Sequence, residues 1–144
     1  MENRDTIYLL KECDAGSKMA VTSIDEVLDK VKDENLKETL IKSKDHHSKL
    51  GNDLHSLLIQ YNSEEKEPNP MAKGMSWMKT NLKIQMNESD STIADLITDG
   101  CDMGIKSLNK YLNEYPAAND KAKDICNRLI NIEEMLCKDM RKYL

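Results

Sequence analysis

The stretch GCDMGIKSLNKYL, residues 100–112, decides the fold, because residues 16–28, GSKMAVTSIDEVL, already carry a version of it. A shift of 84 positions, 100 minus 16, pairs residues of like character: Gly16 with Gly100, Met19 with Met103, Val21 with Ile105, Ser23 with Ser107, Ile24 with Leu108 and Leu28 with Leu112. A repeated helical segment, each copy followed by a second helical segment, indicates two helical hairpins packed face to face. The repeat therefore predicts an architecture and leaves the activity open.

Length and composition point the same way. The 144 residues suit one domain, 1–144, with one hydrophobic core. Five Gly, three Pro and no Phe favour long amphipathic helices over a β-sandwich. We expect an all-α protein, an antiparallel four-helix bundle.

The first hairpin is predicted over residues 5–61. Apolar residues recur at alternating steps of three and four, first up to about residue 32 and then up to residue 61, with Asp33 as the N-cap between. The apolar positions are Ile7, Leu10, Val21, Ile24, Leu28 and Val31, then Leu36, Leu40, Leu50, Leu54, Leu57 and Tyr61.

The second hairpin is predicted over residues 91–144. Ser89 or Asp90 offers an N-cap for its first helix, which ends before Pro116, and its second helix runs from about 119 to 143. Adding an offset to the inward positions of the first hairpin predicts those of the second. An offset of 84 gives, for its first helix, Ala94, Thr98, Cys101, Ile105, Leu108, Leu112 and Tyr115. An offset of 86 gives, for its second helix, Ala122, Cys126, Leu129, Glu133, Leu136 and Met140.

The crossover between the hairpins is predicted over residues 62–90. The proline-containing run SEEKEPNP ends the preceding helix, and a short amphipathic helix is expected from 71 to about 86. Its apolar face is a candidate interface: Met71, Met75, Trp77 and Met78. This helix either covers the bundle or takes part in a contact between copies, and we expect a homodimer.

Polar residues interrupt the apolar pattern near the middle of every predicted helix. They are Asp14 and Ser17, Ser43 and His47, Thr98 and Cys101, and Cys126 and Glu133. If the four apolar stripes face one another, these groups form one buried layer and must bond to each other or to a ligand. Glycines 16, 100 and 104 are expected to let the first and third long helices approach closely.

From Leu10 to Leu144 the chain resembles a bacterial family of ferritin-like four-helix-bundle proteins of unknown function. The matching pieces are the opening Leu9–Gly16, the pattern Asp33-x-x-Leu36-Lys37-x-x-Leu40, the lone Trp77 and the stretch Asp99–Leu112. The resemblance implies two hairpins joined by a long crossover.

Ferritin-like oxidases hold two metal ions with one carboxylate from each of two helices and a Glu-x-x-His from each of the other two. The corresponding positions here read Lys44-x-x-His47 and Ile130-x-x-Glu133, and the third helix offers Thr98. This departure disfavours a dinuclear oxidase centre.

Asp14, His47 and Glu133 remain as a possible ligand set. One interpretation is a hydrogen-bonded ion pair around His47, completed by Ser43 and Thr98. A second is a site for one transition-metal ion, namely iron, manganese or zinc, and a third is a small ligand in a polar cavity.

The remaining features exclude several classes of function. The formal net charge of -5, with both signs interspersed, argues against nucleic-acid binding, and no apolar run is long enough to cross a membrane. The four cysteines lack metal-site spacing, so we expect reduced, buried thiols and a cytoplasmic protein. The chain is predicted to be a non-catalytic structural or interaction protein, with a metal-binding or redox protein as the alternative.

Overall fold

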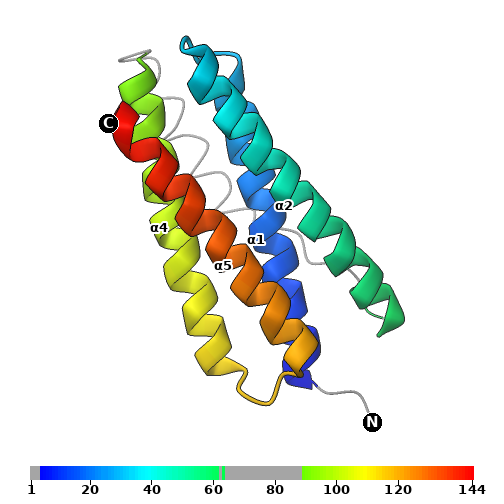
Figure 1. Ribbon diagram of the computed structural model, residues 1–144. Helices are drawn as coiled ribbons and strands as arrows, with labels where there is room; N and C mark the ends of the chain where they lie inside the picture. The colour runs from blue at the N-terminus through cyan, green and yellow to red at the C-terminus, as the bar shows by residue number, and fades with distance from the viewer. Residues whose placement is uncertain (1–3, 62, 64–88) are drawn as a thin grey trace.

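The computed structural model describes residues 4–61, 63 and 89–144 of the chain. Within these ranges all secondary structure is helical, and no strand occurs (Figure 1). The elements are α1 (Arg4–Leu28), α2 (Glu34–Gln60), α4 (Asp90–Glu114), α5 (Asp120–Met140) and the short 3-10 helix η1 (Arg141–Tyr143). The prediction of an all-α protein with four long helices is confirmed.

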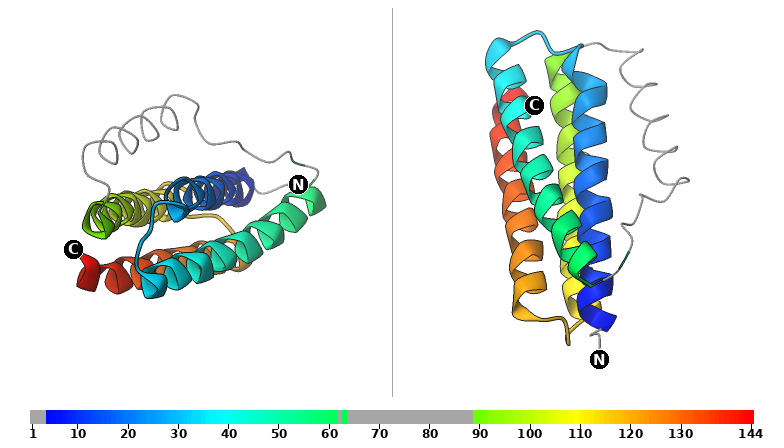
Figure 2. Two further views of the ribbon diagram at one scale, coloured as in Figure 1. Left: turned by 90° about the horizontal axis from the view of Figure 1, so that it is seen from above. Right: turned by 90° about the vertical axis from the view of Figure 1, so that its right-hand side faces the viewer.

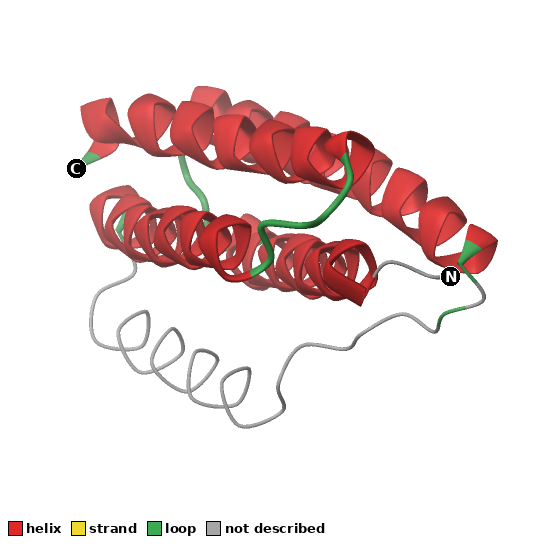
Figure 3. Cartoon of the chain, turned by 90° about the horizontal axis from the view of Figure 1, so that it is seen from below, coloured by secondary structure: helices red, strands yellow, loops and turns green. Residues whose placement is uncertain are grey.

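The long helices pack in two layers. Helices α1 and α4 form one layer, and α2 and α5 form the other (Figures 2 and 3). Each helix also contacts a partner in the other layer, α1 with α2 and α4 with α5, and α1 and α5 touch across the diagonal. Helices α1 and α2 run in opposite directions, as do α4 and α5 (Figure 1).

Side-chain caps fix where three of the helices begin. The carboxylate of Asp33 accepts from the backbone N–H of Leu36 at 3.3 Å, and Ser89 Oγ accepts from the N–H of Thr92 at 3.1 Å. Asn119 caps α5 in the same way, accepting from an N–H three residues on at 2.9 Å. Such caps satisfy N–H groups that have no partner within their own helix.

One end of the bundle is closed by bonds between the start of α1 and the loop before α5. Asp5 accepts from the N–H of Ala117 at 2.9 Å, and Thr6 accepts from the N–H of Asn119 at 2.8 Å. The Asn119 side-chain amide donates to the hydroxyl of Tyr61 at 2.8 Å, so the end of α2 lies here too.

The other end is closed by Asp90, the first residue of α4. Its carboxylate accepts from the N–H groups of Lys32 and Asp33, at 2.8 and 3.0 Å, in the loop between α1 and α2. The end of α2 and the start of α4 therefore lie at opposite ends of the bundle. At 1.5 Å per residue, a helix of the length of α2 spans roughly 40 Å, which the connection from 61 to 89 must cover.

Two apolar clusters fill the interior, and each draws on all four long helices. The first includes Leu9, Leu54, Leu108 and Leu129, and the second includes Ile24, Leu40, Ile93 and Met140. The buried polar side chains Asp14, Ser17, Ser43, His47 and Glu133 come from the mid-length of α1, α2 and α5. The core is thus divided by a polar section.

Some predicted boundaries and inward positions need correction. Helix α1 ends at Leu28 rather than about residue 32, and α5 ends at Met140 with η1 in place of a last turn. Thr98 was expected inward, but it is half-buried and bonds back to the carbonyl of Ala94, while Ile97 is buried instead. A threonine hydroxyl can satisfy itself on its own helix in this way.

The expected crossover helix and most of residues 62–90 lie outside the described residues. Among the helices that the structure does describe, none has the length and apolar character needed to cross a membrane.

Candidate functional site

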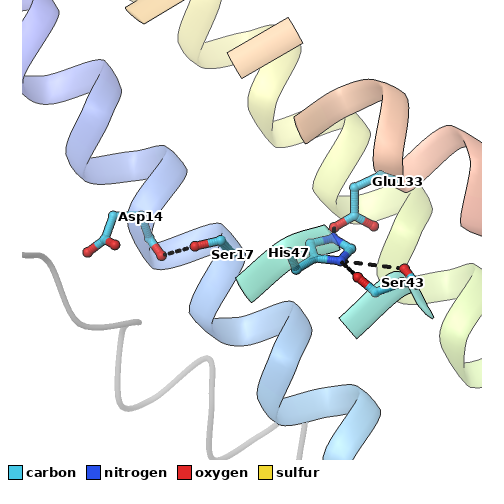
Figure 4. Close-up of polar contacts among 5 residues, drawn as sticks. All are labelled: Asp14, Ser17, Ser43, His47 and Glu133. Carbon is cyan, nitrogen blue, oxygen red and sulfur yellow. Dashed lines mark hydrogen bonds and ion pairs between the residues drawn. The ribbon is translucent and has the colours of Figure 1, made fainter. Parts of the chain in front are cut away.

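The centre of the candidate site is a direct bond between α2 and α5. Ser43 and His47 are four residues apart and therefore share the inward face of α2, and Glu133 lies on the inward face of α5. His47 is fully buried and Glu133 is 7% exposed. His47 Nε2 lies 3.1 Å from Glu133 Oε1 (Figure 4).

The other ring nitrogen determines the hydrogen-bond chemistry of this pair. His47 Nδ1 lies 2.8 Å from the backbone carbonyl oxygen of Ser43, and a carbonyl oxygen can only accept, so Nδ1 carries a proton. Ser43 Oγ lies at 3.5 Å from the same nitrogen. A bond between Nε2 and Oε1 then needs one more proton, carried either by the ring as imidazolium or by the Glu133 carboxyl. The pair shares one proton between two helices.

Helix α4 completes the surroundings of Glu133. The Cys101 thiol donates a hydrogen bond to the Glu133 carboxylate, and burial, together with the negative charge of Glu133, raises the pKa of this thiol well above its ordinary value. Gly104 also faces the carboxylate, since a Cβ at this position would lie 3.5 Å from Glu133 Cδ. The Glu133 carboxylate is therefore held by α2 on one side and by α4 on another.

Asp14 and Ser17 lie on α1 and make different contacts. Asp14 is 1% exposed, and its Oδ2 lies 3.3 Å from Lys18 Nζ, one turn further along the helix. Ser17 Oγ donates to the backbone carbonyl of Asp14 at 2.9 Å. A Cβ on Gly51 of α2 would lie 3.3 Å from Ser17 Oγ. Glycine at position 51 therefore leaves room for this hydroxyl.

The structure brings together two of the three predicted metal ligands. His47 and Glu133 bond to one another, whereas the Asp14 carboxylate points away from them (Figure 4). Asp14 pairs instead with Lys18 on its own helix. In the part of the chain that the structure describes, no three His, Cys, Asp or Glu side chains form a group that could hold a metal ion.

The residues present also do not fit the dinuclear centre that the family resemblance implies. Lys44 stands where the Glu of a Glu-x-x-His would be, and it forms an ion pair with Asp25 on α1. One imidazole and one carboxylate, already bonded to each other, are too few donors for two metal ions.

The roles of the glycines near this site differ from what the sequence predicted. Gly51 was not singled out, although it lies one residue after the inward-facing Leu50. Glycines 16, 100 and 104 were expected to bring α1 and α4 together, which is wrong. Gly104 makes room for Glu133 on α5, Gly16 faces Leu129 on α5, and no atom lies within 4 Å of a Cβ built on Gly100.

The predicted interface residues Met71, Met75, Trp77 and Met78 lie outside the described residues. Cys126, predicted in the polar layer, instead lies in the first apolar cluster.

No family model matches this chain, and no curated protein or solved structure matches it either.

Proposed function

We propose that this chain is a cytoplasmic, non-catalytic ferritin-like helical bundle that serves as a structural or interaction protein and self-associates. The observation that supports it most is the His47–Glu133 bond. The two side chains with the greatest capacity for chemistry at the bundle centre are fully buried or nearly so and are bonded across two helices. Groups used in this way stabilise one arrangement of helices.

The arrangement of the helices supports the ferritin-like part of the proposal. Helices α1 and α2 pack as one antiparallel pair and α4 and α5 as another, and the intervening chain starts and finishes at opposite ends of the bundle. A long crossover of this kind is typical of ferritin-like bundles.

Self-association is tested by sedimentation velocity over a wide concentration range. We expect a species with twice the 16.5 kDa mass of the chain at high concentration. A 16.5 kDa species alone, at every concentration, contradicts self-association.

The single tryptophan provides a second measurement of the same association. Trp77 is the one tryptophan of the chain and belongs to the predicted interface. Dilution below the dissociation constant of the dimer is expected to shift its emission to longer wavelength, because water would reach the indole ring. The Trp77→Ser variant is expected to sediment as the monomer at concentrations where the wild-type chain is dimeric.

A metal-binding or redox protein with a single ion is the second candidate. The observation that favours it is the proximity of the His47 imidazole to the Glu133 carboxylate on facing helices. These two ligand types suit iron, manganese or zinc. The test is elemental analysis of protein purified without a histidine tag, beside the His47→Ala variant. One equivalent of metal in the wild type and none in the variant supports this candidate, and negligible metal in both rejects it.

A further inference from the structure

The thiols of Cys13 and Cys126 meet inside the first apolar cluster. Cys13 lies on α1 and Cys126 on α5, both are fully buried, and both are free thiols. Their side chains are hydrogen-bonded to one another. Cys126 Sγ in turn donates to the backbone carbonyl of Leu108 on α4 at 3.8 Å. A chain of sulfur hydrogen bonds thus joins three helices.

Small side chains explain why two sulfurs from diagonally placed helices can touch. Three residues after Cys13, Gly16 faces α5, where a Cβ would lie 3.9 Å from Leu129 Cδ2. Leu129 in turn lies three residues after Cys126, so the two contacts are neighbours on the same helix pair. Helices α1 and α5 are therefore in close contact over about one helical turn, from Cys13 and Cys126 to Gly16 and Leu129.

The two thiols differ in how easily each would lose its proton. The hydrogen bond with Cys126 and burial raise the pKa of the Cys13 thiol. The same hydrogen bond, now received from Cys13, lowers the pKa of the Cys126 thiol. The thiolate is the nucleophilic form of cysteine, so Cys126 is the sulfur better suited to attack.

We propose that Cys13 and Cys126 are an oxidation site at which hydrogen peroxide forms a disulfide between α1 and α5. The Cys126 thiolate attacks one peroxide oxygen, the O–O bond breaks, and the leaving hydroxide takes a proton to become water. Cys13 then attacks the Cys126 sulfenic sulfur, the S–O bond breaks, and a second water leaves with the Cys13 proton. Two electrons pass from the two sulfurs to the peroxide, and the first helix becomes covalently joined to the last.

Cys101 and Cys137 serve as internal controls. Cys101 donates to Glu133, and the Cys137 thiol lies 3.6 Å from Asp102 Oδ1. Burial and these carboxylates raise the pKa of both thiols. Arg141 favours the thiolate of Cys137, the most exposed of the four cysteines, but burial and Asp102 outweigh it and the pKa stays raised.

The test is peptide mapping of the full chain after treatment with hydrogen peroxide under native conditions. Remaining thiols are blocked with a maleimide in denaturant, and the protein is digested with trypsin without reduction. Cleavage after Lys and Arg places Cys13 in peptide 12–18, Cys126 in peptide 124–128, and the other two cysteines in separate peptides. We expect peptides 12–18 and 124–128 to be linked, with the loss of two hydrogen atoms, and to separate on reduction.

Two results would overturn the proposal: recovery of both peptides with blocked, unoxidised thiols, or linkage of either one mainly to a peptide carrying Cys101 or Cys137. The Cys137→Ala variant is the matched control and is expected to form the same linked pair. In the Cys13→Ala variant no disulfide can form at Cys126, and a sulfenic acid reactive toward dimedone is expected there. The wild-type map decides the question even if this variant does not fold.

Discussion

His47 is held from both of its ring nitrogens. The Ser43 carbonyl requires a proton on Nδ1, and Glu133 requires the proton between Nε2 and Oε1. Removing either partner leaves a buried polar group without its bond, which costs far more than removing both. The pair is therefore a strong constraint on how α2 and α5 meet.

The His47→Ala variant should be strongly destabilised. Breaking a buried pair of this kind costs about 3–5 kcal/mol, because the remaining partner stays buried without compensation. The measurement is the free energy of unfolding from urea denaturation. His46→Ala is the matched control, since this neighbouring histidine is exposed, and its expected effect is within about 0.5 kcal/mol of zero. Equal effects at the two positions would contradict the assigned role of His47.

Cys101 should make stability fall at alkaline pH. The pKa of this thiol is raised in the folded chain from an ordinary value of 9.0, so above pH 9 the unfolded chain loses a proton that the folded chain keeps. Stability is therefore present below pH 9 and is lost as the pH rises. Between pH 8 and pH 10 the wild type should lose about 1.4 kcal/mol more than Cys101→Ala, measured by urea denaturation. If the free energies of unfolding of the wild type and Cys101→Ala changed equally with pH, the assigned effect of the Cys101 thiol would be refuted.

At the scale of elements, Asp90 joins the loop between α1 and α2 to the start of α4. Its carboxylate accepts two backbone N–H groups, from Lys32 and Asp33. The Asp90→Ala variant should lose about 1.5–3 kcal/mol of unfolding free energy, since hydrogen bonds to a charged group are the stronger kind. Ser91→Ala, at the exposed next position, is the control and should be near neutral. A small effect of Asp90→Ala would show that the loop is held in another way.

The glycines within helices should respond differently to a methyl group. A Cβ on Gly100 meets nothing within 4 Å, so Gly100→Ala should stabilise the bundle by about 0.5–1 kcal/mol through lower backbone entropy in the unfolded chain. At Gly51 the same Cβ would lie 3.3 Å from Ser17 Oγ, and the gain should be smaller or reversed. Thermal denaturation of the two variants gives the comparison. A larger gain at Gly51 than at Gly100 would contradict the packing described between α1 and α2.

The sequence pattern predicted some helices far better than others. All inward positions predicted for α5 are buried, and so are all those of α2 except Tyr61, which is half-buried. On α1 the apolar pattern was partly wrong: Leu10 and Ile24 are buried as predicted, but Ile7, Val21 and Leu28 are only half-buried. Leu9, Cys13 and Val27 are buried instead, on a helix that contacts α2, α4 and α5. On α4 the repeat offset placed Thr98 inward in place of Ile97, and Ile105 and Leu112, also predicted inward, are only half-buried. Periodicity gives the face of a helix, but the number of neighbours sets how wide the buried face is.

At the scale of the whole molecule, the polar centre lies between apolar clusters that each include residues from all four helices. The sequence predicted which residues are polar and central, including Asp14, His47 and Glu133. It could not predict which of them meet, because that depends on the register and rotation of each helix relative to its neighbours. Asp14 and Glu133 are both buried, yet only Glu133 bonds to His47, and the Asp14 carboxylate pairs with Lys18.

The most direct test of a structural role for this centre is a double-mutant cycle with His47→Leu, Glu133→Leu and the double variant. If the pair only holds α2 against α5, each single variant leaves a buried polar group alone, whereas the double variant leaves an apolar contact. We predict that the double variant folds, is more stable than either single variant, and shows a coupling energy of about 2 kcal/mol or more in urea denaturation. Additive losses, with the double variant the least stable of the three, would contradict a structural pairing of His47 with Glu133.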